Sequence, residues 1–419
     1  MAFADSYIEK YLYKDTLVKK TPLPAGSFHY IVVIPAYCED DIYSTLQSLV
    51  DCKLPSKEIM VIIAVNYSVK DSNEIKAQND NNYLHLTNWA EEKSTKELAF
   101  VPVLAPNLPA KHAGAGLARK IGMDLAIMHF NKTDNHEGVI VSLDADTIIP
   151  KEYFLQLENG YTDDCNIAGC IFNFSHLCKH EDQLTKEHRE AIISYELHLR
   201  YFRHGLLFAN YPYNLYTIGS CFSVKAKMYC KYGGMNRRKA GEDFYFLHKI
   251  FPNEKFSFLK DCQVYPSPRL SKRVPFGTGP VINKILEGEK FTTYAPNCFV
   301  VLKEFLDLIM EYYPHGKPDD ILANGNINKW VVEFLGSKNF TSRIEEIKSN
   351  VSNETAFHKR FLNWFNGLLV IQLFNFLSEK EFKKLDVKNA VNEMFHLQQK
   401  SILDSIDKQL DYYEELEKS

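Results

Sequence analysis

Two apolar runs decide the fold: HYIVVIPA at His29–Ala36, and VIVSL at Val139–Leu143, which continues directly into Asp144-Ala145-Asp146. Both runs are short and rich in β-branched residues, which is typical of strands buried on both faces of a parallel sheet. Two more runs of this kind lie between them, at Ile59–Val65 and Leu98–Leu104. Helical spacing separates the runs, so the sequence predicts βαβ units in a doubly wound, mostly parallel sheet.

The rest of the chain predicts three regions. Residues 1–27 read as a helical lead-in that ends at proline and glycine breakers, residues 28–299 as the α/β domain, and residues 300–419 as an all-helical C-terminal extension. Within the second half, we expect strands at 167–174 and 216–224 and helices at 183–208, 241–250, 300–313, 329–335, 356–377 and 379–417.

Composition excludes several classes of protein. Of 419 residues, 45% are hydrophobic and 24% charged, which excludes wholesale disorder and allows a sizeable core. The net charge of −4 argues against nucleic-acid binding by bulk charge. Nine scattered cysteines without a CxxC pair predict reduced thiols and a cytoplasmic protein. The N-terminus lacks the apolar core of a signal peptide, and polar residues interrupt Phe361–Leu377, so we expect no membrane span.

The sharpest chemical feature is the pair Asp144 and Asp146 at the end of a predicted strand. In open α/β sheets, ligands bind beyond the carboxyl ends of the strands. Two carboxylates there can hold a divalent metal that also binds phosphate oxygens. The plain alternative is a solvated turn.

A second acidic motif, Gly241-Glu242-Asp243, opens a predicted helix. A carboxylate that acts as a general base at a sugar hydroxyl would look like this. The alternative is simple helix capping, because acidic residues are favoured at helix N-termini.

Basic residues gather beside both acidic motifs. The plain alternative is that the segments carrying them are ordinary surface loops. A nucleotide diphosphate held by one metal would call for such local positive charge. The loop that contains Arg269 and Arg273 also combines prolines and glycines, which suits a lid over an anionic ligand. The cations are Lys111, Arg119 and Lys120, then Arg237, Arg238 and Lys239, then Arg269, Lys272 and Arg273.

In this order, these motifs resemble family 2 glycosyltransferases of the GT-A fold. Ile34-Pro35-Ala36-Tyr37-Cys38-Glu39 is similar to that family's opening strand, Asp144-Ala145-Asp146 to its DxD motif, and Gly241-Glu242-Asp243 to its ED motif. Gly114–Arg119 is similar to the family's helix start, and Tyr216–Phe222 to its acceptor-side strand, which contains Gly219 and Ser220.

The resemblance implies transfer of a sugar from a nucleotide-sugar, with Mn or Mg as cofactor. It places Pro35, Tyr37 and Glu39 around the nucleotide. The placement of positive charge adds Lys111, Arg119, Arg269 and Arg273 as further candidates for binding the nucleotide-sugar. Asp144 would lie near the ribose or donor sugar and share the metal with Asp146. Asp243, beside Glu242, would deprotonate the acceptor if the reaction inverts.

The sequence also departs from the family pattern. Cys38 replaces an asparagine, and Asn66 stands near the place of the base-contacting aspartate. The QxxRW motif of processive synthases is absent, and the family's third metal ligand, a later histidine, has no clear match. These departures leave the base of the nucleotide open.

Two alternative functions remain: a sugar-phosphate nucleotidyltransferase, and a non-catalytic nucleotide-sugar-binding protein on a GT-A scaffold. The first would need a glycine-rich basic loop after the first strand, where this chain has Tyr37-Cys-Glu-Asp-Asp41. The expected acceptor is a carbohydrate or a lipid-linked sugar. The C-terminal helices suit packing on their own domain or on a second copy of the chain, and Leu368–Phe376 is a candidate for peripheral contact with the inner face of a membrane.

Overall fold

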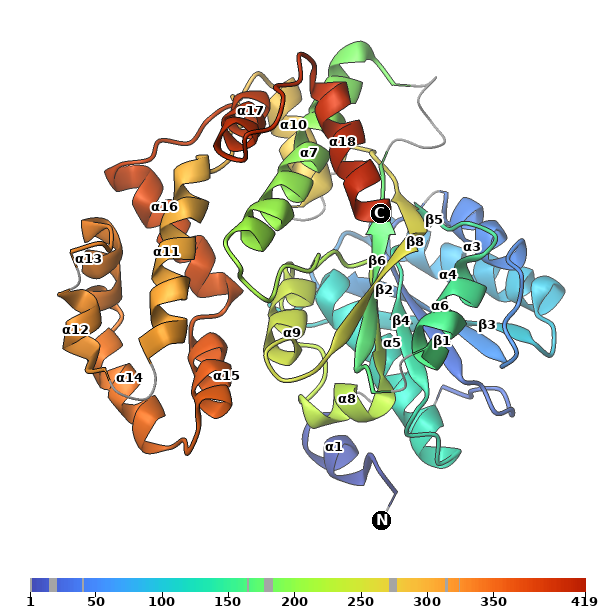
Figure 1. Ribbon diagram of the computed structural model, residues 1–419. Coiled ribbons are helices and arrows are strands. Elements are labelled where there is room, and N and C mark those ends of the chain that lie inside the picture. The colour runs from blue at the N-terminus through green and yellow to red at the C-terminus, as the bar shows by residue number, and fades with distance from the viewer. Residues whose placement is uncertain are drawn as a thin grey trace. The chain divides into compact units, whose positions relative to one another are not determined.

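The computed structural model describes residues 2–14, 21–39, 41–163, 166–176, 184–270, 277–312, 316–323 and 325–419. Contacts divide the chain into two compact units, an α/β unit and a helical unit (Figure 1). The α/β unit comprises Met1–Glu181, Tyr216–Ile250 and Glu254–Pro280, and the helical unit comprises Asp182–Leu215, Phe251–Asn253 and Val281–Ser419.

The α/β unit is built on an eight-stranded sheet of order β3-β2-β1-β4-β7-β6-β8-β5. Strands β1 to β4 are parallel neighbours, β6 is parallel to β8, and β7 runs antiparallel between β4 and β6. The strands are β1 (Tyr30–Ala36), β2 (Ile59–Ser68), β3 (Leu98–Leu108), β4 (Val139–Ser142), β5 (Thr147–Ile148), β6 (Gly169–Phe174), β7 (Phe222–Lys225) and β8 (Phe256–Pro266).

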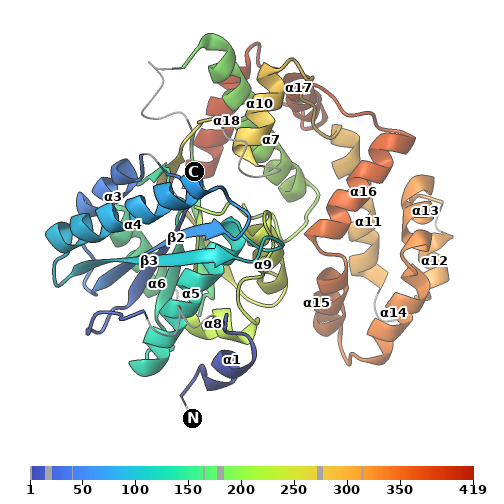
Figure 2. The same cartoon turned by 180° about the vertical axis from the view of Figure 1, so that it is seen from behind.

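Burial explains why the first strands form. Every residue of β1 and of β2 is buried, so β-branched side chains fill both faces of the sheet. Helix α5 packs on β1 and β2, and α4 packs on β2 and β3 (Figure 2). The helices of this unit are α1 (Asp5–Lys10), α3 (Ile42–Val50), α4 (Asn73–Lys93), α5 (Ala115–Lys132), α6 (Tyr153–Asp163), α8 (Ala226–Lys231) and α9 (Glu242–Ile250).

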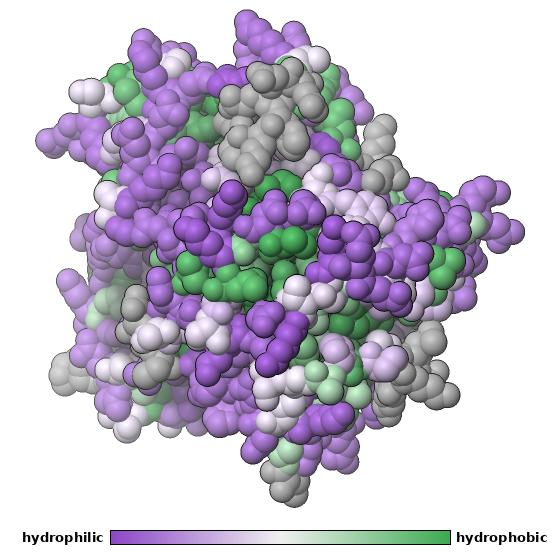
Figure 3. All heavy atoms as spheres, turned by 90° about the vertical axis from the view of Figure 1, so that its right-hand side faces the viewer, coloured by the Kyte–Doolittle hydropathy of each residue, from purple (hydrophilic) through white to green (hydrophobic). Residues whose placement is uncertain are grey.

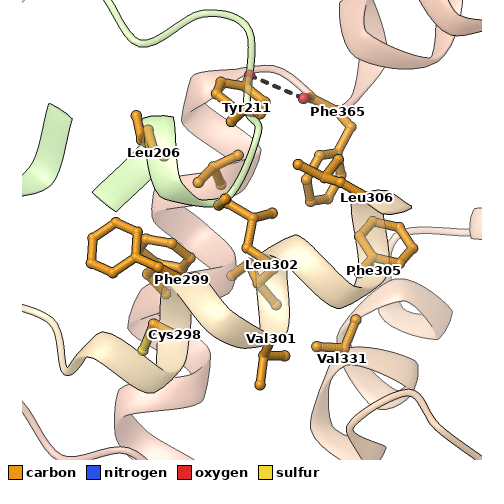
Figure 4. Packing of buried hydrophobic residues seen from close by; sticks show 14 of the residues in the cluster. Leu206, Tyr211, Cys298, Phe299, Val301, Leu302, Phe305, Leu306, Val331 and Phe365 are labelled. Atoms are coloured by element: carbon orange, nitrogen blue, oxygen red, sulfur yellow. Dashed lines mark hydrogen bonds between the residues drawn. The ribbon is translucent and has the colours of Figure 1, made fainter. Parts of the chain in front are cut away.

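The helical unit has its own apolar core. In Figure 4, Phe299, Leu302 and Phe305 lie among side chains from neighbouring helices, and the hydroxyl of Tyr211 donates a hydrogen bond to the carbonyl of Phe365 at 3.2 Å. Helix α10 (Thr278–Leu286) contains the boundary between the units. The other helices are α7 (Lys186–Phe208), α11 (Pro296–Tyr312), α12 (Pro318–Leu322), α13 (Lys329–Ser337), α14 (Phe340–Ser349), α15 (Glu354–Trp364), α16 (Gly367–Lys380), α17 (Val387–Leu397) and α18 (Ile406–Lys418).

The predicted α/β fold, with a mostly parallel sheet and an all-helical C-terminal region, is confirmed, and it is consistent with the GT-A fold that the resemblance implied. The domain boundary at residue 300 stays a prediction. By its contacts, α7 groups with the helical unit, although it precedes that boundary.

Three predicted elements differ from the structure. The helix expected at 356–377 is two helices, because Asn366 caps the second by accepting hydrogen bonds from the N–H groups of Leu368 and Leu369. The helix expected at 379–417 is likewise interrupted, and Ser405 caps α18. The strand expected at 216–224 is confined to β7, because a backbone hydrogen bond from Cys221 to Ile218 closes a turn before it.

The surface in Figure 3 is mostly hydrophilic, with apolar patches between the polar side chains. Across the part of the chain that the structure describes, no helix alone has the length and apolar character needed to cross a membrane. Helices α15 and α16 reach those limits only when taken together, and the pair is bent by 61°.

Candidate functional site

The Asp144-Ala145-Asp146 motif lies where β4 ends, at the carboxyl edge of the sheet. The N–H of Leu143 still donates to the carbonyl of Val33 in β1, at 3.1 Å, and Asp144 is the next residue. On the other side, the N–H of Ser267, just after β8, donates to the carbonyl of Asp146 at 3.1 Å. The motif is therefore fixed between the ends of two strands, where ligands of such sheets bind.

A buried arginine joins this motif to the second acidic motif. The guanidinium of Arg119, near the start of α5, forms ion pairs with Asp144 and with Glu242. The side chains of Arg119 and Glu242 are 3% and 5% exposed. Burial alone would lower the pKa of Arg119, but the negative charges of Glu242 and Asp144 outweigh it and raise that pKa.

Two glycines make room for this arrangement. A Cβ on Gly219 would lie 2.6 Å from Nη2 of Arg119, and a Cβ on Gly116 would lie 2.1 Å from the carbonyl oxygen of Arg238. The segment before Glu242 therefore packs directly on the start of α5. The structure gives Gly219, expected on the acceptor side, close contact with Arg119.

A second arginine joins the first strand to the DxD motif. Nη2 of Arg269 lies 2.5 Å from Oε2 of Glu39, and its Nε lies 2.8 Å from Oδ2 of Asp146. Burial would lower the pKa of Arg269, and the charges of Asp146 and Glu39 raise it instead. Through Arg119 and Arg269, four carboxylates from distant parts of the sequence converge at one edge of the sheet.

Asp243 lies in the first turn of α9, next to Glu242. Its Oδ1 accepts a hydrogen bond from the N–H of the next residue, Phe244, at 2.7 Å, which satisfies one of the N–H groups left free at the start of the helix. Burial and the charge of Glu242 raise the pKa of Asp243 to about 7, against the opposing effect of Arg119. A carboxylate with a pKa near neutral is suited to accept a proton in this pH range. Gly241, with φ of +68°, provides the turn that leads into the helix.

Other predicted site residues lie in different surroundings. Pro35 is buried inside β1, and Tyr37 follows that strand half-buried. Asn66 is buried, and its amide donates to the carbonyl of Ala36 at 2.8 Å, so it joins the ends of β1 and β2. Ser220 is fully buried.

Of the predicted basic residues that the structure describes, Arg119 and Arg269 are the two in the centre of the site. Lys111 is exposed in the turn after β3. Lys120, expected beside phosphate, is instead buried against Asp124, with Nζ and Oδ2 3.0 Å apart. Arg273 lies outside the described residues.

Sequence reasoning did not anticipate Asn236, whose amide donates to the carbonyl of Glu242 at 2.9 Å, or Asn79, which accepts the N–H of Cys38 at 3.0 Å. Both are single asparagines outside any motif, so the sequence offers no signal for them.

The donor set fits a divalent metal only in part. Within the described ranges, no group of three or more His, Cys, Asp or Glu side chains is arranged to hold a metal. Asp144 and Asp146 supply two carboxylates, which suits Mg²⁺ when phosphate oxygens and water complete its shell. The residues present therefore fit a metal that binds together with a diphosphate.

Comparison with known proteins gives distant likenesses. No family model and no curated protein matches the chain. The crystal structure of S. aureus TarS 1-349 is 12% identical with a TM-score of 0.39, over 93% of this chain and 88% of that one. The structure of the same fragment in complex with UDP-GlcNAc shares 12% sequence identity with this chain and has a TM-score of 0.38. The match covers 90% of this chain and 95% of that one. The crystal structure of S. aureus TarS shares 12% sequence identity with this chain and has a TM-score of 0.37. The match covers 84% of this chain and 55% of that one. These values carry no argument about chemistry.

Gly219→Ala should disturb the site through Arg119. The added methyl group meets Nη2, so we expect a loss of about 1–3 kcal/mol in the free energy of unfolding. Gly336→Ala is the matched control, because nothing lies within 4 Å of that position in α13. It should leave the protein as stable or up to about 1 kcal/mol more stable. Urea unfolding of both variants measures this, and equal stability of the two would contradict the close contact.

Proposed function

We propose that the protein is a metal-dependent glycosyltransferase that moves a sugar from a UDP- or GDP-sugar to an acceptor hydroxyl. One observation carries the proposal: the side chains of the DxD motif, the ED motif and the opening strand converge through Arg119 and Arg269. A carbohydrate or lipid-linked acceptor in glycan or glycolipid synthesis would suit this chemistry.

The donor would bind at the carboxyl edge of the sheet. Asp144 and Asp146 would hold Mn²⁺ or Mg²⁺, which when bound offsets the charge that grows on the departing diphosphate. Arg119 keeps Asp144 in place, and Arg269 does the same for Asp146 and Glu39. Fixed charges of this kind favour a transition state without reorganising during the reaction.

Asp243 would serve as the general base. Its carboxylate takes the proton of the acceptor hydroxyl while the acceptor oxygen bonds to the anomeric carbon of the sugar. The bond from that carbon to the diphosphate oxygen breaks, and the nucleoside diphosphate leaves with the bonding electrons. Glu242, paired with Arg119, lies beside the base, and its negative charge raises the pKa of Asp243.

Replacing the two acidic side chains tests these roles. Asp146→Asn should lower transfer about 100-fold or more through loss of a metal ligand, and Asp243→Asn about 100- to 10,000-fold through loss of the base. Asp261→Asn, an exposed carboxylate on β8, is the control and should retain full activity. The measurement is nucleotide release from the donor in the presence of acceptor. Full activity in the first two variants, shown to be folded, would refute the proposal.

Metal binding should depend on the nucleotide. Because the protein supplies two carboxylates, Mn²⁺ alone should bind weakly, and UDP or GDP should tighten it about tenfold or more. Calorimetric titration with and without the nucleotide measures this, and EDTA should abolish transfer. Equally tight metal binding in the two titrations would show a complete protein site and contradict the two-carboxylate assignment.

The pH profile should report Asp243. The base works only when ionised, so kcat/KM should rise with pH and level off above about 7. Below that pH, kcat/KM should fall about tenfold per pH unit, because a protonated Asp243 cannot take the proton of the acceptor hydroxyl. Initial rates in buffers of constant ionic strength check this. A flat profile between pH 5 and 8 would argue against a base with a raised pKa.

A further inference from the structure

Two segments far apart in the sequence meet beside the ED motif. His112, in the turn after β3, donates from Nδ1 to the carbonyl of Arg237 at 3.1 Å. A Cβ on Gly114 would lie 3.3 Å from the carbonyl oxygen of Lys239. This contact gathers four cationic residues, which we call the basic patch: Lys111, Arg237, Arg238 and Lys239.

Among the residues that the structure describes, the basic patch has no negative partner. All four residues are exposed, and no carboxylate among the described residues forms an ion pair with any of them. The guanidinium of Arg238 lies over the ring of Tyr245, 3.7 Å from its centroid, which fixes one cation without neutralising it. Exposed cations without an ion-pair partner among the described residues leave local positive charge, which attracts an anion.

The patch belongs to the base side of the site. Lys239 stands three residues before Glu242 on the same segment, and the carbonyl of Arg238 packs against Gly116, one turn before Lys120 on α5. The donor side is defined separately by Glu39, Asp146 and Arg269. An acceptor must approach Asp243 for its hydroxyl to lose a proton, so the patch adjoins the path of the acceptor.

We propose that the basic patch binds a negatively charged group of the acceptor, so that the acceptor is an acidic glycan, with phosphate, sulfate or carboxylate groups near the hydroxyl that receives the sugar. This inference rests on the proposed function and adds the chemical class of the second substrate. Arginine and lysine side chains at the rim of a site attract such groups and orient them.

The test uses an anionic and a neutral probe on the full chain. Fluorescein-labelled heparin hexasaccharide and maltohexaose are titrated with the wild type and with the Arg237→Glu/Lys239→Glu variant. The control variant is Lys57→Glu/Lys96→Glu, which changes the net charge equally at exposed lysines that precede β2 and β3, at the opposite edge of the sheet. Fluorescence anisotropy measures the dissociation constants, and the salt concentration is kept constant.

We expect the wild type to bind the acidic probe and not maltohexaose. The Arg237→Glu/Lys239→Glu variant should bind the acidic probe about tenfold more weakly or worse, whereas the control variant should bind it like the wild type. Equal weakening in both variants would show bulk charge and overturn the inference. Binding of the wild type to phosphatidylglycerol vesicles without binding to the acidic probe would also overturn the inference. A raised KM for the nucleotide-sugar in the Arg237→Glu/Lys239→Glu variant would overturn it too, because it would assign the patch to the donor's diphosphate. If no nucleotide-sugar were hydrolysed, the proposed function would be overturned instead. The two failures are distinguishable because the probe titrations do not depend on donor hydrolysis.

Discussion

The ion pairs of the Arg119 guanidinium are the interaction on which the rest of the site depends. A buried cation is costly unless carboxylates surround it, and here they come from Asp144, 25 residues along the chain, and Glu242, 123 residues along. The requirement to pair one charge therefore fixes the end of β4 to the start of α9. Gly219 and Gly116 are small because the guanidinium and the neighbouring backbone occupy the space a side chain would need.

Much of the α/β unit could be predicted because burial leaves a simple pattern. The first strands are covered on both faces, so β-branched runs mark them, and Asp144 could be placed at a strand end by counting along one run. The irregular segment at 216–221, which ends in a turn, escaped prediction because its apolar residues read as a strand. The break at Asn366 escaped because apolar residues continue on both sides of this cap.

The side-chain partners were beyond reach from the sequence. Asn66 and Lys120 have the residue types of ligand-binding groups, yet Asn66 binds the backbone of β1 and Lys120 is buried against Asp124. Such pairings depend on which elements meet in space, and a single sequence carries no record of that. The DxD and ED motifs could be recognised, whereas the arginines that join them became evident only from the coordinates.

The central claim is that these converging carboxylates transfer a sugar from a nucleotide donor. Its most direct measurement is release of free nucleotide from a panel of UDP-, GDP- and CDP-sugars, with Mn²⁺ and with EDTA. The account predicts release from UDP- or GDP-sugars that requires the metal. Nucleotide-dependent thermal stabilisation with no release from any donor would contradict it, and would indicate a binding protein on the same scaffold.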